Sequence, residues 1–145
     1  MTILVGYTGR PASRQALHVA MEEARRRGEA LHLVHVLEHE PGESPTQVRR
    51  EAQAADQAEQ HLDAVRERLT EGGITTTTEL QHSAHGRTGQ VLLDAAQRLD
   101  ASLIVLGIEP RSKLEKLILG SVARDVLLRA DCPVLTVKAE PHDES

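Results

Sequence analysis

Aromatic side chains are nearly absent, because the chain has one tyrosine and neither phenylalanine nor tryptophan among its 145 residues. Proteins that bind single-stranded nucleic acid stack bases on such rings, so this sequence offers no platform for stacking. Basic residues are not in excess either, since 17 Lys and Arg stand against 22 Asp and Glu and give a net charge of −5. Nucleic-acid binding normally needs a basic face. We therefore expect no nucleic-acid partner.

Cysteine and long apolar runs are equally scarce. The single cysteine, Cys132, has no partner for an internal disulfide, as is usual in a reducing compartment. The apolar runs are only a handful of residues long, which is too short to span a bilayer. The N-terminus shows no basic segment that leads into an apolar one, as a secretory signal would. These observations predict a cytoplasmic protein without membrane contact.

Motifs of common catalytic sites are missing as well. The sequence contains no Gly-x4-Gly-Lys-Ser/Thr, no Gly-x-Gly-x-x-Gly and no Gly-x-Ser-x-Gly. Ser121 has no arrangement of histidine and acid to activate it, and the position of Cys132, beside an aspartate and a proline, favours an inert thiol. His82 and His85 have a His-x-x-His spacing, but no carboxylate or thiol completes a recognisable metal set with them. We expect neither an enzyme nor a metal site.

What the sequence does contain is a regular alternation of short apolar runs and helical patterns. The third run is β-branched and polar, which predicts a strand near a sheet edge. His32 and His35 lie within the second run, where packing in a sheet explains them. The five predicted strands are Thr2–Tyr7, Leu31–Leu37, Ile74–Leu80, Leu103–Leu106 and Val134–Val137.

Four helices are predicted between these strands. Ser13 can cap the first helix, and Gly28 ends it after three arginines that suit the negative end of the helix dipole. The second spans Thr46–Leu69, with apolar residues at alternating steps of three and four, and the third spans Gln90–Leu99. The last begins at Gly120-Ser121 and stops before Cys132-Pro133. Its predicted buried face comprises Val122, Val126, Leu127 and Ala130.

The order βαβαβαβαβ predicts an α/β fold with a five-stranded parallel sheet, doubly wound and Rossmann-like. We expect one domain over residues 1–145, with a polar tail from about residue 139. Ligands of such sheets bind beyond the carboxyl ends of the strands, at the point where the strand order reverses. The loops expected there are Thr8–Pro11, Glu38–Pro45, Gln81–Gly89 and Gly107–Leu119.

The turn Gly120-Ser121 has two interpretations. The first N–H groups of a helix have no internal partner and carry the positive end of the dipole, so the turn suits a phosphate. Alternatively, Gly120 only lets the chain turn and Ser121 only caps the helix. Local sequence leaves both open.

Four segments resemble the universal stress protein family: ILVGYTG at the start, LVHVL, IVLG, and ILGSVARDVLLRADCPVLTV near the end. The resemblance covers essentially the whole chain, and the last segment is its most specific part. It implies a small cytoplasmic α/β protein that responds to stress, is not a catalyst, and binds ATP or AMP.

The family's nucleotide-binding pattern is Gly-x2-Gly-x9-Gly-Ser/Thr, and the resemblance assigns its residues here. Gly107, Gly120 and Ser121 match the pattern, Val122 follows it, and Val36 matches the residue that contacts adenine. Two positions depart: Pro110 replaces the second glycine, and Thr8 replaces an aspartate that faces adenine and ribose. Proline has no N–H, and threonine has only a neutral hydroxyl. Arg111 and Lys113 either reach a triphosphate or are solvated loop charges.

The resemblance also implies an assembly. In the family the last strand commonly pairs with its copy across a two-fold axis, and a free apolar edge invites such pairing. We therefore expect a homodimer through Val134–Val137, and name no other protein partner. The alternative function is an interaction module of the same fold that binds no nucleotide.

Overall fold

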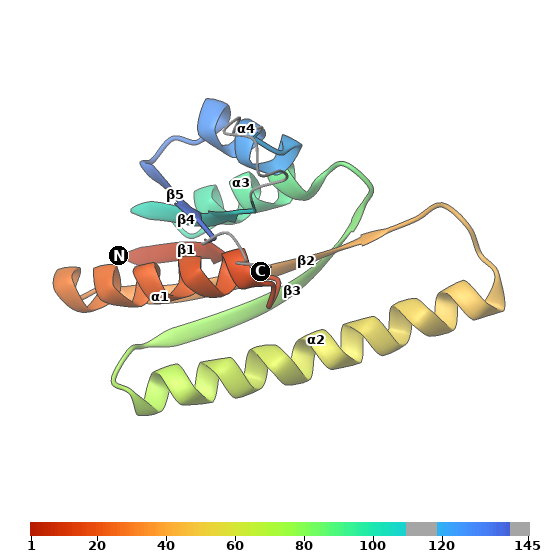
Figure 1. Cartoon of the computed structure of the whole chain (residues 1–145), viewed down its shortest axis with the longest axis horizontal. Coiled ribbons are helices and arrows are strands. Elements are labelled where there is room, and N and C mark those ends of the chain that lie inside the picture. The colour runs from red at the N-terminus through yellow and green to blue at the C-terminus, as the bar shows by residue number, and fades with distance from the viewer. Residues whose placement is uncertain (110–118, 140–145) are drawn as a thin grey trace, which may run out of the picture.

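Five parallel strands lie side by side in the order β3-β2-β1-β4-β5. The structure, a computed structural model, describes residues 1–109 and 119–139 (Figure 1). The predicted α/β fold with a five-stranded parallel sheet is confirmed. The strands are β1 Thr2–Gly6, β2 Ala30–His39, β3 Thr76–Ala84, β4 Leu103–Ile108 and β5 Val134–Lys138. The helices are α1 Pro11–Arg27, α2 Pro45–Glu71, α3 Thr88–Arg98 and α4 Ser121–Arg129.

Two apolar clusters, one on each face of the sheet, hold the fold together. Alternate residues of a strand point to opposite faces, so Ile3 and Val5 pack on α1 and α2 while Leu4 packs on α3 and α4. Ile3, Leu4 and Val5 are completely buried. This explains why the central strands are continuous apolar runs in the sequence, as is usual for strands covered on both faces.

The sheet reverses its order at β1 and β4. The chain proceeds from β1 through β2 to β3 on one side, then crosses to β4 and β5 on the other. Beyond the carboxyl ends of β1 and β4 the two halves diverge, which is where ligands of this architecture bind. No helix in the described ranges is both long enough and apolar enough to cross a membrane.

The predicted loop Gln81–Gly89 is wrong in its first half, because β3 continues to Ala84. β3 is longer than predicted because its neighbour β2 runs to His39, and the two strands stay paired up to His39 and Ala84. Beyond Val34, the described pairings of β2 are with β3 alone. We call this projecting pair of segments, residues 36–39 and 81–84, the arm. Figure 1 shows β2 continuing past β1 toward the loop that leads into α2.

Two predictions about helices also need correction. Ser13 does not cap α1, which begins at Pro11 with Arg10 as N-cap; the Ser13 hydroxyl instead donates to the Arg10 carbonyl at 3.0 Å. Proline is favoured in the first helical turn because it needs no N–H partner there. Leu127 of α4 is not on the buried face, since it is 41% exposed and Ala123 is buried in its place. The stop at Gly28 is confirmed, with a left-handed backbone (φ 66°).

Candidate functional site

A cavity of about 560 Å³ lies beyond the carboxyl ends of β1 and β4, at the point where the strand order reverses. Six of the eight predicted site residues line it: Thr8, Val36, Gly107, Gly120, Ser121 and Val122. The other two, Pro110 and Arg111, lie outside the described residues, as does Lys113. The cavity therefore collects residues from β1, β2, β4 and α4 that are far apart in the sequence.

Thr8 belongs to the tight turn between β1 and α1. Its hydroxyl donates to Ser13 Oγ at 3.2 Å and accepts the Arg10 N–H at 3.3 Å. Its backbone N–H also donates to Ser13 Oγ, at 3.2 Å. Because a hydroxyl has one proton and two lone pairs, Thr8 retains one acceptor position for a ligand and no charge.

Gly107 has a role in packing. An added Cβ would lie 2.3 Å from both the carbonyl carbon and the carbonyl oxygen of Ala12, and 2.8 Å from the backbone nitrogen of Ser13. These are backbone atoms of the first turn of α1, so they cannot rotate away as a side chain would. The fold itself therefore requires glycine here.

Gly120 differs from Gly107. A Cβ added there would meet no described atom within 4 Å, and its backbone is extended (φ −65°, ψ 165°). It is the N-cap of α4 and has no side chain to satisfy the N–H groups of the first turn. Ser121, Val122 and Ala123 of that turn all line the cavity. This uncapped helix start can accept an anion.

The rest of the lining divides into an apolar part and a polar rim. The apolar part suits a flat ring system: Val34, Val36, Leu92, Leu106 and Ile108. Three polar side chains at the rim were not predicted from sequence: Arg10, Thr88 and Glu109. The Thr88 hydroxyl donates to Glu38 Oε1 at 2.6 Å. Nothing in the local pattern marks such residues, because their position depends on the fold.

Tyr7 connects the cavity to α2. It lines the cavity, and its hydroxyl lies 2.9 Å from His61 Nε2 while the two rings stack. Burial raises the pKa of Tyr7 more than the nearby Arg68 and Arg14 lower it, so the phenol keeps its proton at neutral pH. The protonated phenol can donate to His61 Nε2 or accept from it, according to the tautomer of the imidazole.

Ser121, Cys132 and the histidines are the other residues that the sequence offered for catalysis or metal binding. No hydrogen bond joins Ser121 to a histidine or carboxylate within the part of the chain that the structure describes. Burial and the neighbouring Asp131 raise the pKa of Cys132, which favours the unreactive thiol. His32 is a packed sheet residue, 6% exposed, as predicted. His82 lies against His39 and not with His85.

Comparison with known proteins identifies the same family that the sequence segments resemble. The model of the universal stress protein family matches residues 1–138. A universal stress protein of Mycolicibacterium smegmatis is 34% identical over 140 residues, which are 97% of this chain and 98% of the relative.

Solved structures agree in fold. A universal stress protein from Archaeoglobus fulgidus is 29% identical with a TM-score of 0.70, covering 95% of this chain and 93% of that chain. A second structure from A. fulgidus, in complex with dAMP, is 26% identical with a TM-score of 0.63. It covers 94% of this chain and 96% of that chain.

Proposed function

Because this chain belongs to the universal stress protein family, we propose that it binds ATP or AMP weakly and regulates a stress response without catalysis. The observation that carries the proposal is the cavity lined by all six of the described site residues. Its apolar part suits the base, and the uncapped start of α4 suits a phosphate. A relative of the same fold binds dAMP, which supports an adenine nucleotide as the ligand.

Binding is weaker than in relatives with the full pattern, for two reasons. Pro110 brings no N–H to the phosphate loop, and Thr8 offers a ribose hydroxyl one neutral acceptor where an aspartate offers a charged one. A lost hydrogen bond costs about 0.5–1.5 kcal/mol when neutral and about 1.5–3 kcal/mol when a charged group takes part. Together the two losses amount to roughly a hundredfold in affinity, at about 1.4 kcal/mol per factor of ten.

The non-catalytic role rests on which side chains around the cavity could remove a proton. Among the described residues, no histidine lines the cavity, and its one lining carboxylate, Glu109, makes no described hydrogen bond to Ser121. A hydrolase would need a group that removes a proton from water at the phosphate. We therefore assign the site to binding and release of the nucleotide, with its occupancy as the signal.

One observation favours the alternative, a module that binds no nucleotide. Gly107 is required by its contact with α1 whether or not a ligand binds, so this part of the glycine pattern follows from the fold alone. A substitution of Gly120 can distinguish the two functions, because no described atom lies within 4 Å of the position that its Cβ would take. A side chain added there therefore starts in open space, at the end of the cavity where we expect the phosphate.

The test is calorimetric titration of the protein and of Gly120→Leu with ATP, AMP and cyclic AMP. We expect weak, saturable binding of at least one nucleotide by the unaltered chain and none by the variant. A circular dichroism spectrum of the variant that matches the unaltered chain shows that the sheet is intact. If no nucleotide binds, the interaction module is the better account. If Gly120→Leu binds equally well, the nucleotide does not occupy the start of α4 as proposed.

The proposal includes the assembly and the location. The chain forms a homodimer through Val134–Val137 of β5, an edge strand of the sheet, and acts in the cytoplasm. Residues of β5 are only half-buried in the single chain, which supports further burial by a partner strand.

A further inference from the structure

Two histidines of the arm form a close pair that the sequence does not suggest. His39 ends β2 and His82 lies in β3, 43 residues further along the chain. Their rings are nearly parallel, with centroids 4.8 Å apart, and His39 Nε2 lies 2.6 Å from His82 Nδ1. Two neighbouring imidazole nitrogens share either a proton or a metal ion.

Two histidines of this region each have a carboxylate close to their Nδ1 atom. Glu51 of α2 places Oε2 3.2 Å from His39 Nδ1, and Glu38 places Oε2 3.1 Å from His85 Nδ1. Histidines that bind metals almost always donate their second ring N–H to such a group, which fixes the tautomer and leaves the other nitrogen as the ligand. The Glu51 contact meets the distance of a hydrogen bond but not its angle, so His39 must rotate slightly to complete it.

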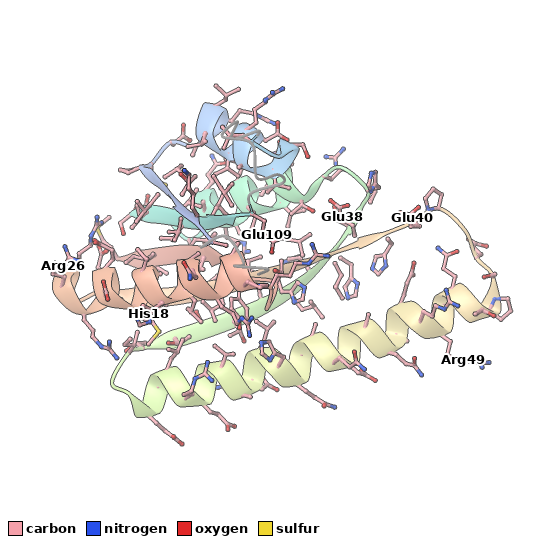
Figure 2. The ribbon with its side chains drawn as sticks, in the orientation of Figure 1. His18, Arg26, Glu38, Glu40, Arg49 and Glu109 are labelled. Carbon is pink, nitrogen blue, oxygen red and sulfur yellow. The ribbon has the colours of Figure 1, made fainter. Side chains whose placement is uncertain are left out.

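The pair opens onto solvent with room for an ion and its waters. A hollow of about 540 Å³ is lined by His39, Glu40, Pro41, His82, Ser83, Ala84 and His85. Figure 2 shows Glu38 on the projecting part of β2 and Glu40 just beyond its end, both away from α1 and its labelled His18. The hollow is distinct from the nucleotide cavity, since no described residue lines both.

We propose that the His39–His82 pair binds a divalent transition metal such as Zn²⁺. His39 Nε2 and His82 Nδ1 are the protein ligands, and Glu51 orients His39. No three His, Cys, Asp or Glu side chains already meet at one point in the described ranges. Water molecules therefore complete the coordination shell.

Binding an ion requires both nitrogens to move apart and both rings to turn. Zn–N bonds of about 2.0–2.1 Å in a tetrahedral site place two ligand nitrogens roughly 3.3 Å apart. The nitrogens of the pair are 2.6 Å apart and face each other, so they must separate by roughly 0.7 Å and the rings must turn until both lone pairs point at one ion; His82 is exposed and has room to do so. Imidazole is a ligand for zinc, copper and nickel, whereas magnesium and calcium prefer oxygen. The site therefore selects transition metals.

The test is calorimetric titration of the full chain with ZnCl₂ alone, in a buffer that does not bind metals. We expect saturable binding near one ion per chain, lost in both His39→Gln and His82→Gln. His18→Gln is the matched control, because His18 is an exposed histidine on α1 beside Glu22, and it should bind zinc as the unaltered chain does. Magnesium should give no heat.

A second pair of measurements separates a site from simple histidine affinity. Glu51→Gln should weaken zinc binding by about tenfold to a hundredfold, as loss of such a carboxylate partner does elsewhere. Protons compete for the same nitrogens, so affinity should fall as the solution is acidified. Cobalt in place of zinc should give a visible absorption band that His82→Gln removes.

Three results would overturn the proposal. One is no zinc binding by a folded chain, in which case the pair only shares a proton. Another is equal binding by His39→Gln, His82→Gln and the unaltered chain. The third is a loss in His18→Gln as large as that in His39→Gln.

Discussion

Gly107 and Gly120 both border the nucleotide cavity, yet an added methyl group meets different surroundings at each. At position 107 it overlaps the backbone of Ala12, and at position 120 it meets no described atom. Gly107→Ala must therefore push α1 away from β4, and overpacking of this kind costs about 1–3 kcal/mol. Urea unfolding should show that loss. Gly120→Ser, a change to a preferred N-cap residue, should show none; equal effects of the two changes would contradict the assignment.

Glu79 is a second residue whose effect on stability can be measured. Burial alone raises its pKa, but hydrogen bonds from Arg98, Gln81 and His32 outweigh that effect and lower the pKa from 4.5 to about 2. The Arg98 Nη2 contact to Oε1 is 2.8 Å and that of His32 Nε2 is 2.6 Å. The carboxylate thus ties the edge strand β3 to β2 and to the end of α3.

The lowered pKa of Glu79 makes the stability of the folded chain depend on pH in a definite direction. The charged form is favoured in the folded state, so its contribution is complete above pH 4.5 and is lost as the pH falls through about 2. Glu79→Gln should be less stable at neutral pH by about 1.5–3 kcal/mol, the usual range for hydrogen bonds to a charged group. Urea unfolding at several pH values should show this gap closing in acid.

The control for this prediction is Glu59→Gln, which changes an exposed carboxylate on α2. It should change the free energy of unfolding by no more than about 0.5 kcal/mol at any pH. A constant gap for Glu79→Gln down to strongly acidic pH would argue against the role of the charge.

Residue roles such as these could be predicted only in part. The resemblance to the family's glycine pattern assigned Gly107, Gly120 and Ser121 to the site, whereas the local sequence indicated only that the helix start at Gly120-Ser121 could hold a phosphate. The contact between Gly107 and Ala12 could not be predicted, since it depends on how β4 lies against α1. Likewise, nothing near His39 in the sequence indicates a partner in His82.

At the level of elements, apolar runs, β-branched residues and helical periodicity predicted every strand and helix that the structure describes, and apart from the exposed face of Leu127 the errors fall at their ends. The segment that ends β3 is polar and looks like a loop, yet it pairs with β2 as far as Ala84. That pairing is a property of two strands, so a single segment does not reveal it. Ser13 was mistaken for an N-cap because Pro11, two residues earlier, already begins the helix.

β5 is the strand through which we expect two chains to pair. It lies at one edge of the sheet, and its residues Val134 to Val137 are half-buried. A proline removes the N–H that strand pairing needs, so Leu135→Pro should turn a homodimer into a monomer or an aggregate. Light scattering at micromolar concentration gives the mass of both proteins. A monomeric unaltered chain would rule the dimer out.

For the molecule as a whole, the fold was predictable and the ligand only partly so. Alternating strands and helices leave few arrangements, because crossovers between parallel strands are right-handed and both faces must be covered. Affinity for a nucleotide depends instead on a few hydrogen bonds. Thr8 shows why: the residue type was known, but only the fold shows that the turn already uses its proton and one lone pair.

Our main proposal is that Thr8 and Pro110 weaken an adenine-nucleotide site that the fold otherwise provides. An aspartate at position 8 can still accept the Arg10 N–H. It cannot donate to Ser13 Oγ as the Thr8 hydroxyl does, so the Ser13 hydroxyl must turn from the Arg10 carbonyl to donate to the carboxylate. A glycine in place of Pro110 returns a backbone N–H to the loop before α4. The double variant Thr8→Asp, Pro110→Gly is therefore the direct test.

The measurement is calorimetric titration of ATP into the unaltered chain and into this double variant under identical conditions. We expect the variant to bind ATP about a hundredfold more tightly, or about 2.8 kcal/mol at 1.4 kcal/mol per factor of ten. Adding Ser121→Ala to the variant should then weaken binding. An affinity unchanged by the two substitutions, or no binding by the folded variant, would show that these positions do not limit nucleotide binding as proposed.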